Sequence, residues 1–186
     1  MLFRRPDYSL DEVLRRLQDE GPSFFLNASW LQHDISPKEP PKTAEQRMSD
    51  RMRKLAPNDE LIITDPYLFT SSRKHDSRDY AASVADMIEP TLVRGLRITA
   101  IVSPAQNDAA VRTAVLDQLN ARCRDLDISV VESPDFHDRF WIADRTRGLV
   151  VGASLNKIGS RIFFVDELSE SDVDAVLSEV DAVVGT

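Results

Sequence analysis

The chain has 186 residues, of which 42% are hydrophobic and 29% are charged, and its formal net charge at pH 7 is −8. This size and composition are typical of one globular domain with a small appendage, and they exclude a disordered chain. No apolar run in the sequence approaches the ~18–20 residues that a membrane-spanning helix needs. The acidic balance disfavours a protein that coats nucleic acid, because such proteins usually carry a basic surface.

Residues 1–42 are predicted to form an N-terminal appendage. Ser9 and Glu12 make a capping box for a first helix, whose apolar residues follow at helical spacing. Residues 23–27 are typical of a short strand. Three prolines lie within residues 35–42, so we expect no regular structure there and place the domain boundary at its end.

From residue 43 the pattern alternates between helices and strands. Thr43 is predicted to cap a helix that ends near Leu55. Apolar strands are expected at residues 60–64, 96–102 and 128–131, and amphipathic helices at 79–94 and 107–124. Strands that alternate with helices require crossover connections, which indicate a largely parallel sheet.

The C-terminal third predicts antiparallel strands. Residues 138–143 and 148–153 are strand-like and are separated by only four residues, which is hairpin spacing. Another strand is expected at 161–165, and Ser171 is predicted to cap a last helix that ends near Val184. The pattern therefore predicts an α/β fold with a mixed, mostly parallel sheet, flanking helices and an antiparallel C-terminal hairpin.

The segment with the clearest chemistry runs from residue 136 to residue 157. Alternate side chains of a strand share a face, so His137 and Arg139 are expected on one face, with their backbones ~7 Å apart. A phosphoryl group fits between them: imidazole can attack phosphorus or move a proton, and guanidinium can hold two phosphoryl oxygens. Ser154 and Asn156 are expected to share a face in the same way and to add neutral hydrogen-bond donors.

This arrangement resembles the motif of the phospholipase D superfamily. That motif reads His, any residue, Lys, four residues, Asp, and then a Gly-Ser-any-Asn run. His137, Arg139 and Asp144 match its first part with the same four-residue gap. Ser154 and Asn156 match its second part. Arginine replaces the lysine of the motif, and the interval between the two parts is longer than usual. The resemblance implies a phospholipase D-like half-fold over residues 43–186.

The same resemblance implies a metal-independent phosphodiesterase that uses no cofactor. In the superfamily one histidine attacks phosphorus, and a histidine from a second motif copy protonates the leaving group. This chain has one copy, because His33 and His75 lack the rest of the motif. Small single-copy members, including bacterial nucleases, form homodimers in which two sites meet. We therefore expect a homodimer with two facing His137 side chains and a phosphodiester substrate such as nucleic acid.

Three further residues are candidates for supporting roles. Asp144 opens the predicted hairpin turn and is expected to pair with His or Arg side chains. Lys157 is a candidate second cation for the substrate. Asp65 follows a strand, and ligands of parallel sheets bind outside the carboxyl ends of strands, so it is a candidate edge of the pocket. An Asp-Pro turn is the alternative explanation of Asp65, and Trp141 is expected in the core.

Two other functions stay open at this level. One is a non-catalytic module that binds a phosphate, a phosphoinositide head group or an acidic peptide. Arg139 favours it, because arginine keeps the grip on phosphate where acid–base geometry is altered. The other is a regulatory part of a bacterial conflict system, docked through the N-terminal appendage. The single cysteine, Cys123, excludes an internal disulfide, and no apolar signal core follows Met1, so we expect a cytoplasmic protein.

Overall fold

The computed structural model describes residues 15, 18, 35–36, 40–70, 76–155, 158 and 163–185. The predicted capping box at Ser9 and the predicted strand at 23–27 lie outside the described residues. Residues from Ile35 onward form one compact unit, which contains the sheet and its helices. The predicted domain boundary at residue 42 stays a prediction.

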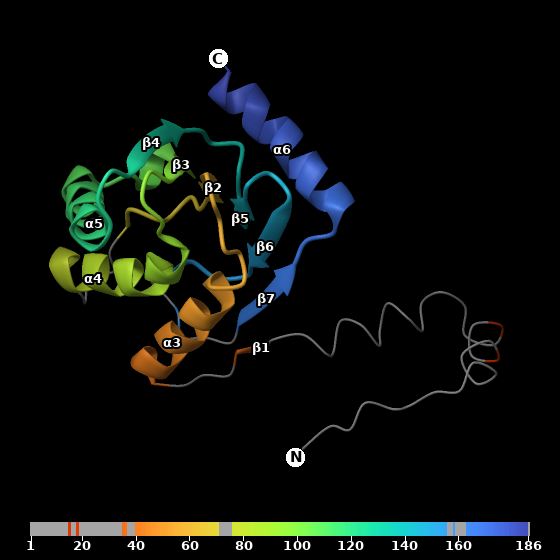
Figure 1. The fold of residues 1–186 in the computed structure, drawn as a ribbon, viewed down its shortest axis with the longest axis horizontal. Helices are drawn as coiled ribbons and strands as arrows, with labels where there is room; N and C mark the ends of the chain where they lie inside the picture. Colours follow the sequence, from red (N-terminus) through yellow and green to blue (C-terminus); the bar gives the residue numbers. More distant parts are fainter. Residues whose placement is uncertain are drawn as a thin grey trace. The chain divides into compact units, whose positions relative to one another are not determined.

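A mixed seven-stranded sheet is the centre of the fold, with strand order β1-β7-β6-β5-β2-β3-β4 (Figure 1). The strands are β1 Ile35–Ser36, β2 Glu60–Thr64, β3 Arg97–Val102, β4 Asp127–Glu132, β5 Arg139–Ala143, β6 Arg147–Val151 and β7 Phe163–Glu167. Strands β2, β3 and β4 are parallel, and the other neighbours are antiparallel. The sheet is mixed as predicted, and the parallel strands and the C-terminal hairpin are both present. Two strand pairs are parallel and four are antiparallel, so the parallel part is smaller than in the predicted mostly parallel sheet.

Four helices cover the two faces of this sheet. They are α3 Pro41–Met52, α4 Ser77–Ile88, α5 Ala109–Arg122 and α6 Glu170–Val184, with short 3₁₀ turns η1 Glu89–Thr91 and η2 Pro104–Gln106. Helices α3, α4 and α5 pack against one face, and α6 packs against the other (Figure 1). The crossover helices α4 and α5 connect the parallel strands, which is the arrangement that the alternating sequence pattern predicts.

Alternation along the strands sorts the side chains into two cores. Leu61 and Ile63 of β2 and Trp141 of β5 face the larger core, under α3, α4 and α5. Ile62 and Ile142 face the smaller core, under α6. The prediction that Trp141 belongs to the core is confirmed, because its side chain is fully buried. Arg139 precedes Trp141 by two residues, so its side chain leaves β5 on the face that the larger core covers.

Several predicted element boundaries are wrong, including the starts of α3 and α6. Residues 35–42 are not free of regular structure, since β1 and the start of α3 both lie there. Helix α3 begins at Pro41 instead of near Thr43, because a proline in the first helical position loses no amide hydrogen bond. The cap of α6 is Ser169 rather than Ser171, and its hydroxyl accepts the amide hydrogen of Asp172.

Candidate active site

Asp65 and Arg139 meet where β2 ends and β5 begins. The antiparallel register pairs Thr64 with Phe140, so the residue that follows β2 lies beside the first residue of β5. Oδ1 of Asp65 is 3.8 Å from Nε of Arg139, and the two side chains are 1% and 18% exposed. The structure thus brings together two predicted site residues that are distant in sequence, at the carboxyl end of a parallel strand.

A buried hydroxyl holds the backbone on both sides of Arg139. The side chain of Thr64 is fully buried. Its Oγ1 donates to the carbonyl of Asp138 at 3.1 Å and accepts from the amide of Phe140 at 2.9 Å. Because these two bonds lie on either side of Arg139, they fix its Cα relative to β2 and so aim the side chain.

The carboxyl group of Asp65 has an unusual electrostatic environment. Burial raises the pKa of Asp65 from 3.8 to about 6, although the amide of Tyr67, the charge of Arg139 and the amide of Leu155 act in the opposite direction. The Tyr67 amide donates to Oδ1 at 2.9 Å. Oδ2 has no hydrogen-bond partner among the described residues. The group is therefore ionised at neutral pH but is protonated in mildly acidic solution.

Two tyrosines that the sequence reasoning missed complete the surroundings of this ion pair. Cζ of Arg139 lies 5.5 Å from the centroid of the Tyr67 ring, which is a cation–π distance. The hydroxyl of Tyr80 donates to the carbonyl of Leu68 at 2.8 Å and holds the segment after β2 against α4. Burial, with the nearby charge of Asp65, raises the pKa of Tyr80 and keeps it neutral. An aromatic residue directly after an Asp-Pro pair was the available sequence signal.

His137 lies outside the regular strand that was predicted to carry it. Regular pairing begins at Arg139, so strand alternation does not place the His137 side chain on the same face as that of Arg139. Its side chain is exposed, whereas Phe136 beside it is buried in the smaller core. His137 is therefore presented to solvent between two anchored neighbours, Phe136 and Arg139.

Ser154 follows β6 and reaches the same end of the sheet. Its side chain is 4% exposed, and its Oγ has no hydrogen-bond partner among the described residues. The amide of Leu155, the next residue, is one of the groups that lower the pKa of Asp65. Ser154 is thus placed near the Asp65–Arg139 pair. The other two candidates on this loop, Asn156 and Lys157, lie outside the described residues.

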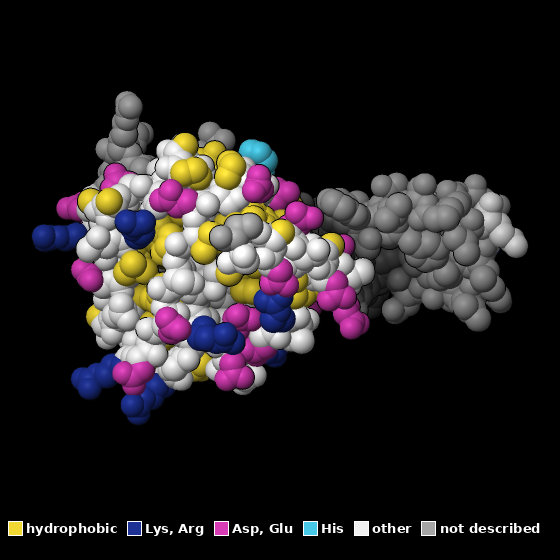
Figure 2. All heavy atoms as spheres, turned by 90° about the horizontal axis from the view of Figure 1, so that it is seen from above, with side chains coloured by type: hydrophobic (Ala, Val, Ile, Leu, Met, Phe, Trp, Pro, Cys, Tyr) yellow, Lys and Arg dark blue, Asp and Glu magenta, His cyan; other side chains and the backbone are white. Residues whose placement is uncertain are grey.

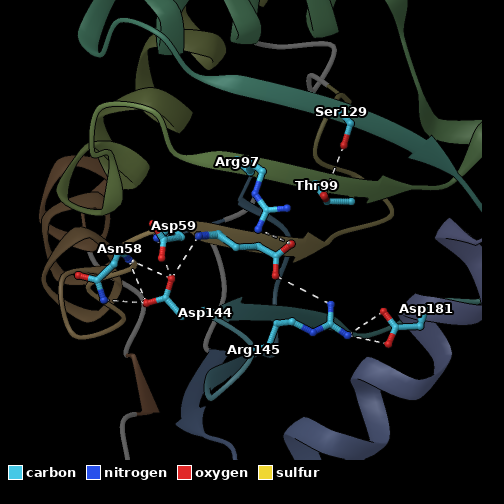
Figure 3. Close-up of polar contacts among 9 residues, drawn as sticks. Asn58, Asp59, Arg97, Thr99, Ser129, Asp144, Arg145 and Asp181 are labelled. Carbon is cyan, nitrogen blue, oxygen red and sulfur yellow. Dashed lines mark hydrogen bonds and ion pairs between the residues drawn. The ribbon is translucent and has the colours of Figure 1, made fainter.

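Asp144 belongs to a different cluster, at the opposite end of β5 (Figure 3). Its carboxylate accepts the backbone amides of Asn58, Asp59 and Glu60 at 2.9 to 3.1 Å. Burial opposes ionisation of Asp144, but these amide bonds outweigh it and lower its pKa below the ordinary value. The arginine that pairs with it, at 2.9 Å, is Arg147 and not Arg139. Asp144 therefore anchors the hairpin turn to the start of β2.

Among the described residues that Figure 2 shows, acidic and basic side chains are interspersed and form no extended patch of one charge. Among the described residues, no group of three or more His, Cys, Asp or Glu side chains is placed to bind a metal ion. None of the helices in the described part of the chain has the length and hydropathy to cross a bilayer.

Comparison with known proteins places the fold. No family model and no curated protein matches the sequence. The structure is similar to that of Nuc from Salmonella typhimurium, a phospholipase D family member, with a TM-score of 0.56 and 12% identity over 83% of this chain and 93% of that one. It is also similar to NucT from Helicobacter pylori, with a TM-score of 0.50 and 11% identity over 81% and 92%. The chain thus has a phospholipase D-like fold, as its motif predicts.

Proposed function

We propose that this protein is a metal-independent phosphodiesterase of the phospholipase D type that cleaves nucleic acid, with His137 as its nucleophile. One observation carries the proposal. On a phospholipase D-like fold, an exposed histidine stands two residues from a partly buried arginine whose backbone and charge are both held in place. Cleavage of a phosphodiester requires a nucleophile and a fixed cation close together, and these two residues supply them.

The proposed reaction has two displacements at phosphorus. The imidazole of His137 attacks, the bond to the leaving oxygen breaks, and a phosphohistidine forms; water then attacks phosphorus and releases the histidine. Arg139 stabilises the charge on the phosphoryl oxygens, and Ser154 and Asn156 donate hydrogen bonds to them. A second chain supplies its own His137 as the acid that protonates the leaving group, so the complete site is a homodimer.

The experiment is a cleavage assay in EDTA on single- and double-stranded DNA, RNA and bis(p-nitrophenyl) phosphate. We expect cleavage by the wild type, no cleavage by His137→Ala, and full activity in the control His33→Ala, because His33 lacks the motif. Sedimentation of the same samples is expected to show a dimer. Cleavage that survives His137→Ala, or that EDTA abolishes, would contradict the proposal.

A second candidate is a non-catalytic module that binds phosphate groups. The observation that favours it is that an arginine occupies the lysine position and pairs with a carboxylate. The arginine of this pair can hold anions and stays charged throughout, so it supplies no proton donor or acceptor near neutral pH. In this case the wild-type protein binds a phosphodiester, sediments as a monomer and cleaves none of the substrates.

A further inference from the structure

The guanidinium of Arg139 is enclosed on two sides by one short segment, residues 65–67. The carboxylate of Asp65 faces its Nε edge at 3.8 Å, and the ring of Tyr67 lies at a cation–π distance from its Cζ. Nε itself is buried and makes no hydrogen bond within the described part of the chain. The contact is therefore electrostatic and steric, and within the described part of the chain no hydrogen bond occupies the Nη donors of the guanidinium.

This segment is itself rigidly attached to the fold. The amide of Asp65 donates to the carbonyl of Ile101 on β3 at 3.1 Å, and the amide of Leu68 donates to the carbonyl of Asp65 at 3.1 Å. The Tyr67 amide bond to Oδ1 fixes the rotamer of Asp65. Tyr80 then ties the segment to α4 through the carbonyl of Leu68. Asp65 is thus a fixed anion, unlike a surface carboxylate.

We propose that Asp65 is the positioning residue of this site, which together with the Tyr67 ring orients the Arg139 guanidinium toward the phosphodiester. The proposal rests on the function proposed above and deepens it. It also explains why arginine works at the lysine position of the motif. Lysine is a point charge that needs no orientation, whereas a planar guanidinium binds two oxygens only when its plane is set.

Simple electrostatics and positioning predict opposite effects of removing the charge of Asp65. If Asp65 acted only as a nearby negative charge, its neutralisation would strengthen the binding of an anion. If it positions Arg139, neutralisation releases the guanidinium and weakens binding, because the ligand must then order the side chain itself. The sign of the effect therefore decides between the two.

The experiment is a titration of the 186-residue chain with dimethyl phosphate, followed by NMR. This diester is inert and carries one negative charge at every pH used, so only the protein titrates. Asp65→Asn keeps the shape of the side chain and an oxygen for the Tyr67 amide, and we expect it to weaken binding about tenfold at pH 7.5. The matched control is Asp125→Asn, which removes an exposed Asp–Arg pair with Arg94, 2.8 Å apart, and is expected to change nothing.

Two further readouts separate positioning from a general structural effect. In an Arg139→Lys background, we expect Asp65→Asn to change affinity by less than about twofold, because there is no guanidinium to orient. The penalty of Asp65→Asn is also expected to fade below pH 6, where the wild-type carboxyl becomes protonated. Among the described residues, the other groups that face Asp65 are Arg139 from β5, Tyr67, and Tyr80 from α4, whose raised pKa keeps it neutral in this range.

Equal or tighter binding by Asp65→Asn would overturn the inference, and so would the absence of any binding by the wild type at millimolar dimethyl phosphate. Failure of the proposed function looks different. If the wild type cleaves no substrate but binds dimethyl phosphate, and Asp65→Asn weakens that binding, the positioning role stands in a protein that only binds. If cleavage depends on His137 but Asp65→Asn binds and cleaves normally, the function stands and the positioning role fails.

Discussion

Asp65 combines burial with ionisation, and this couples the stability of the protein to pH. Its pKa is about 6 in the folded chain, against 3.8 for an ordinary aspartate. The folded state therefore holds the proton more tightly, so this group contributes most stability below pH 3.8 and loses it as pH rises through 6. The difference corresponds to roughly 3 kcal/mol. Asp65→Asn lacks this titration.

We accordingly expect the free energy of unfolding of the wild type, relative to that of Asp65→Asn, to fall by roughly 3 kcal/mol between pH 4 and pH 7.5. Urea denaturation of both proteins at several pH values measures this difference, and other titrating groups cancel because they are common to both. Asp125→Asn, with its exposed carboxylate, is the control and is expected to run parallel to the wild type. A constant difference between wild type and Asp65→Asn would show that Asp65 is not buried as an anion.

For single residues, the sequence predicted which side chains belong to the site better than it predicted which residues they contact. Asp65 was a candidate because the carboxyl ends of parallel strands are binding positions, but an Asp-Pro turn was the preferred explanation of this residue. Its burial depends on Tyr80, whose hydroxyl holds the segment against α4. Similarly, the motif identified Asp144, but its partners at residues 58–60 are 84 to 86 positions away. No local pattern predicts such a contact.

Among the elements, the β5–β6 hairpin depends on the anchoring of its turn. Asp144 and Arg145 both have positive φ, of 49° and 57°, and Asp144 carries the amide bonds from the start of β2. We expect Asp144→Ala to destabilise the protein by about 1 to 3 kcal/mol, because three backbone amides lose their acceptor and alanine disfavours this backbone conformation. Thermal or urea unfolding measures the change.

Two variants make the Asp144 experiment specific. Asp144→Asn keeps one acceptor oxygen and tolerates positive φ, so it is expected to lose distinctly less stability than alanine. Asp117→Ala removes an exposed carboxylate from the middle of α5 and is expected to be nearly neutral. If Asp144→Ala unfolds like Asp117→Ala, the amide bonds contribute little and the turn is held by its strands alone.

The elements that were predicted well are those with strong patterns. Strands β2 to β4 were expected within one or two residues, because each is an apolar run between polar connections. The hairpin was expected because two strand-like runs lie so close together. The start of α3 was missed because this helix begins at Pro41 without a side-chain cap, and the start of α6 was missed because Ser169 and Ser171 were both able to cap it.

For the whole molecule, the strand pattern predicted a parallel part and a hairpin, but not the order of the strands. The resemblance to the phospholipase D motif supplied the fold, and the similarity to Nuc supports it. The insertion of β5 beside β2 is what brings Arg139 to Asp65. This juxtaposition is a property of the topology, and sequence periodicity carries no information about it.

The overall charge makes a last prediction about how this molecule meets nucleic acid. With a net charge of −8, binding must come from a few local cations rather than from a basic surface. Each phosphate neutralised adds about −0.9 to the slope of the logarithm of the binding constant against the logarithm of the salt concentration for duplex DNA.

We expect a slope of about −2 or shallower for His137→Ala, a variant that is expected to bind without cleaving. Fluorescence anisotropy of a labelled oligonucleotide measures this slope. In that background Arg139→Ala is expected to reduce the slope by about 0.9, and Arg94→Ala, which removes an exposed arginine paired with Asp125, is expected to leave it unchanged. A slope as steep as that of proteins with six or more phosphate contacts would instead indicate a basic surface elsewhere on the chain. Nucleic acid would then bind at that surface and not at Arg139.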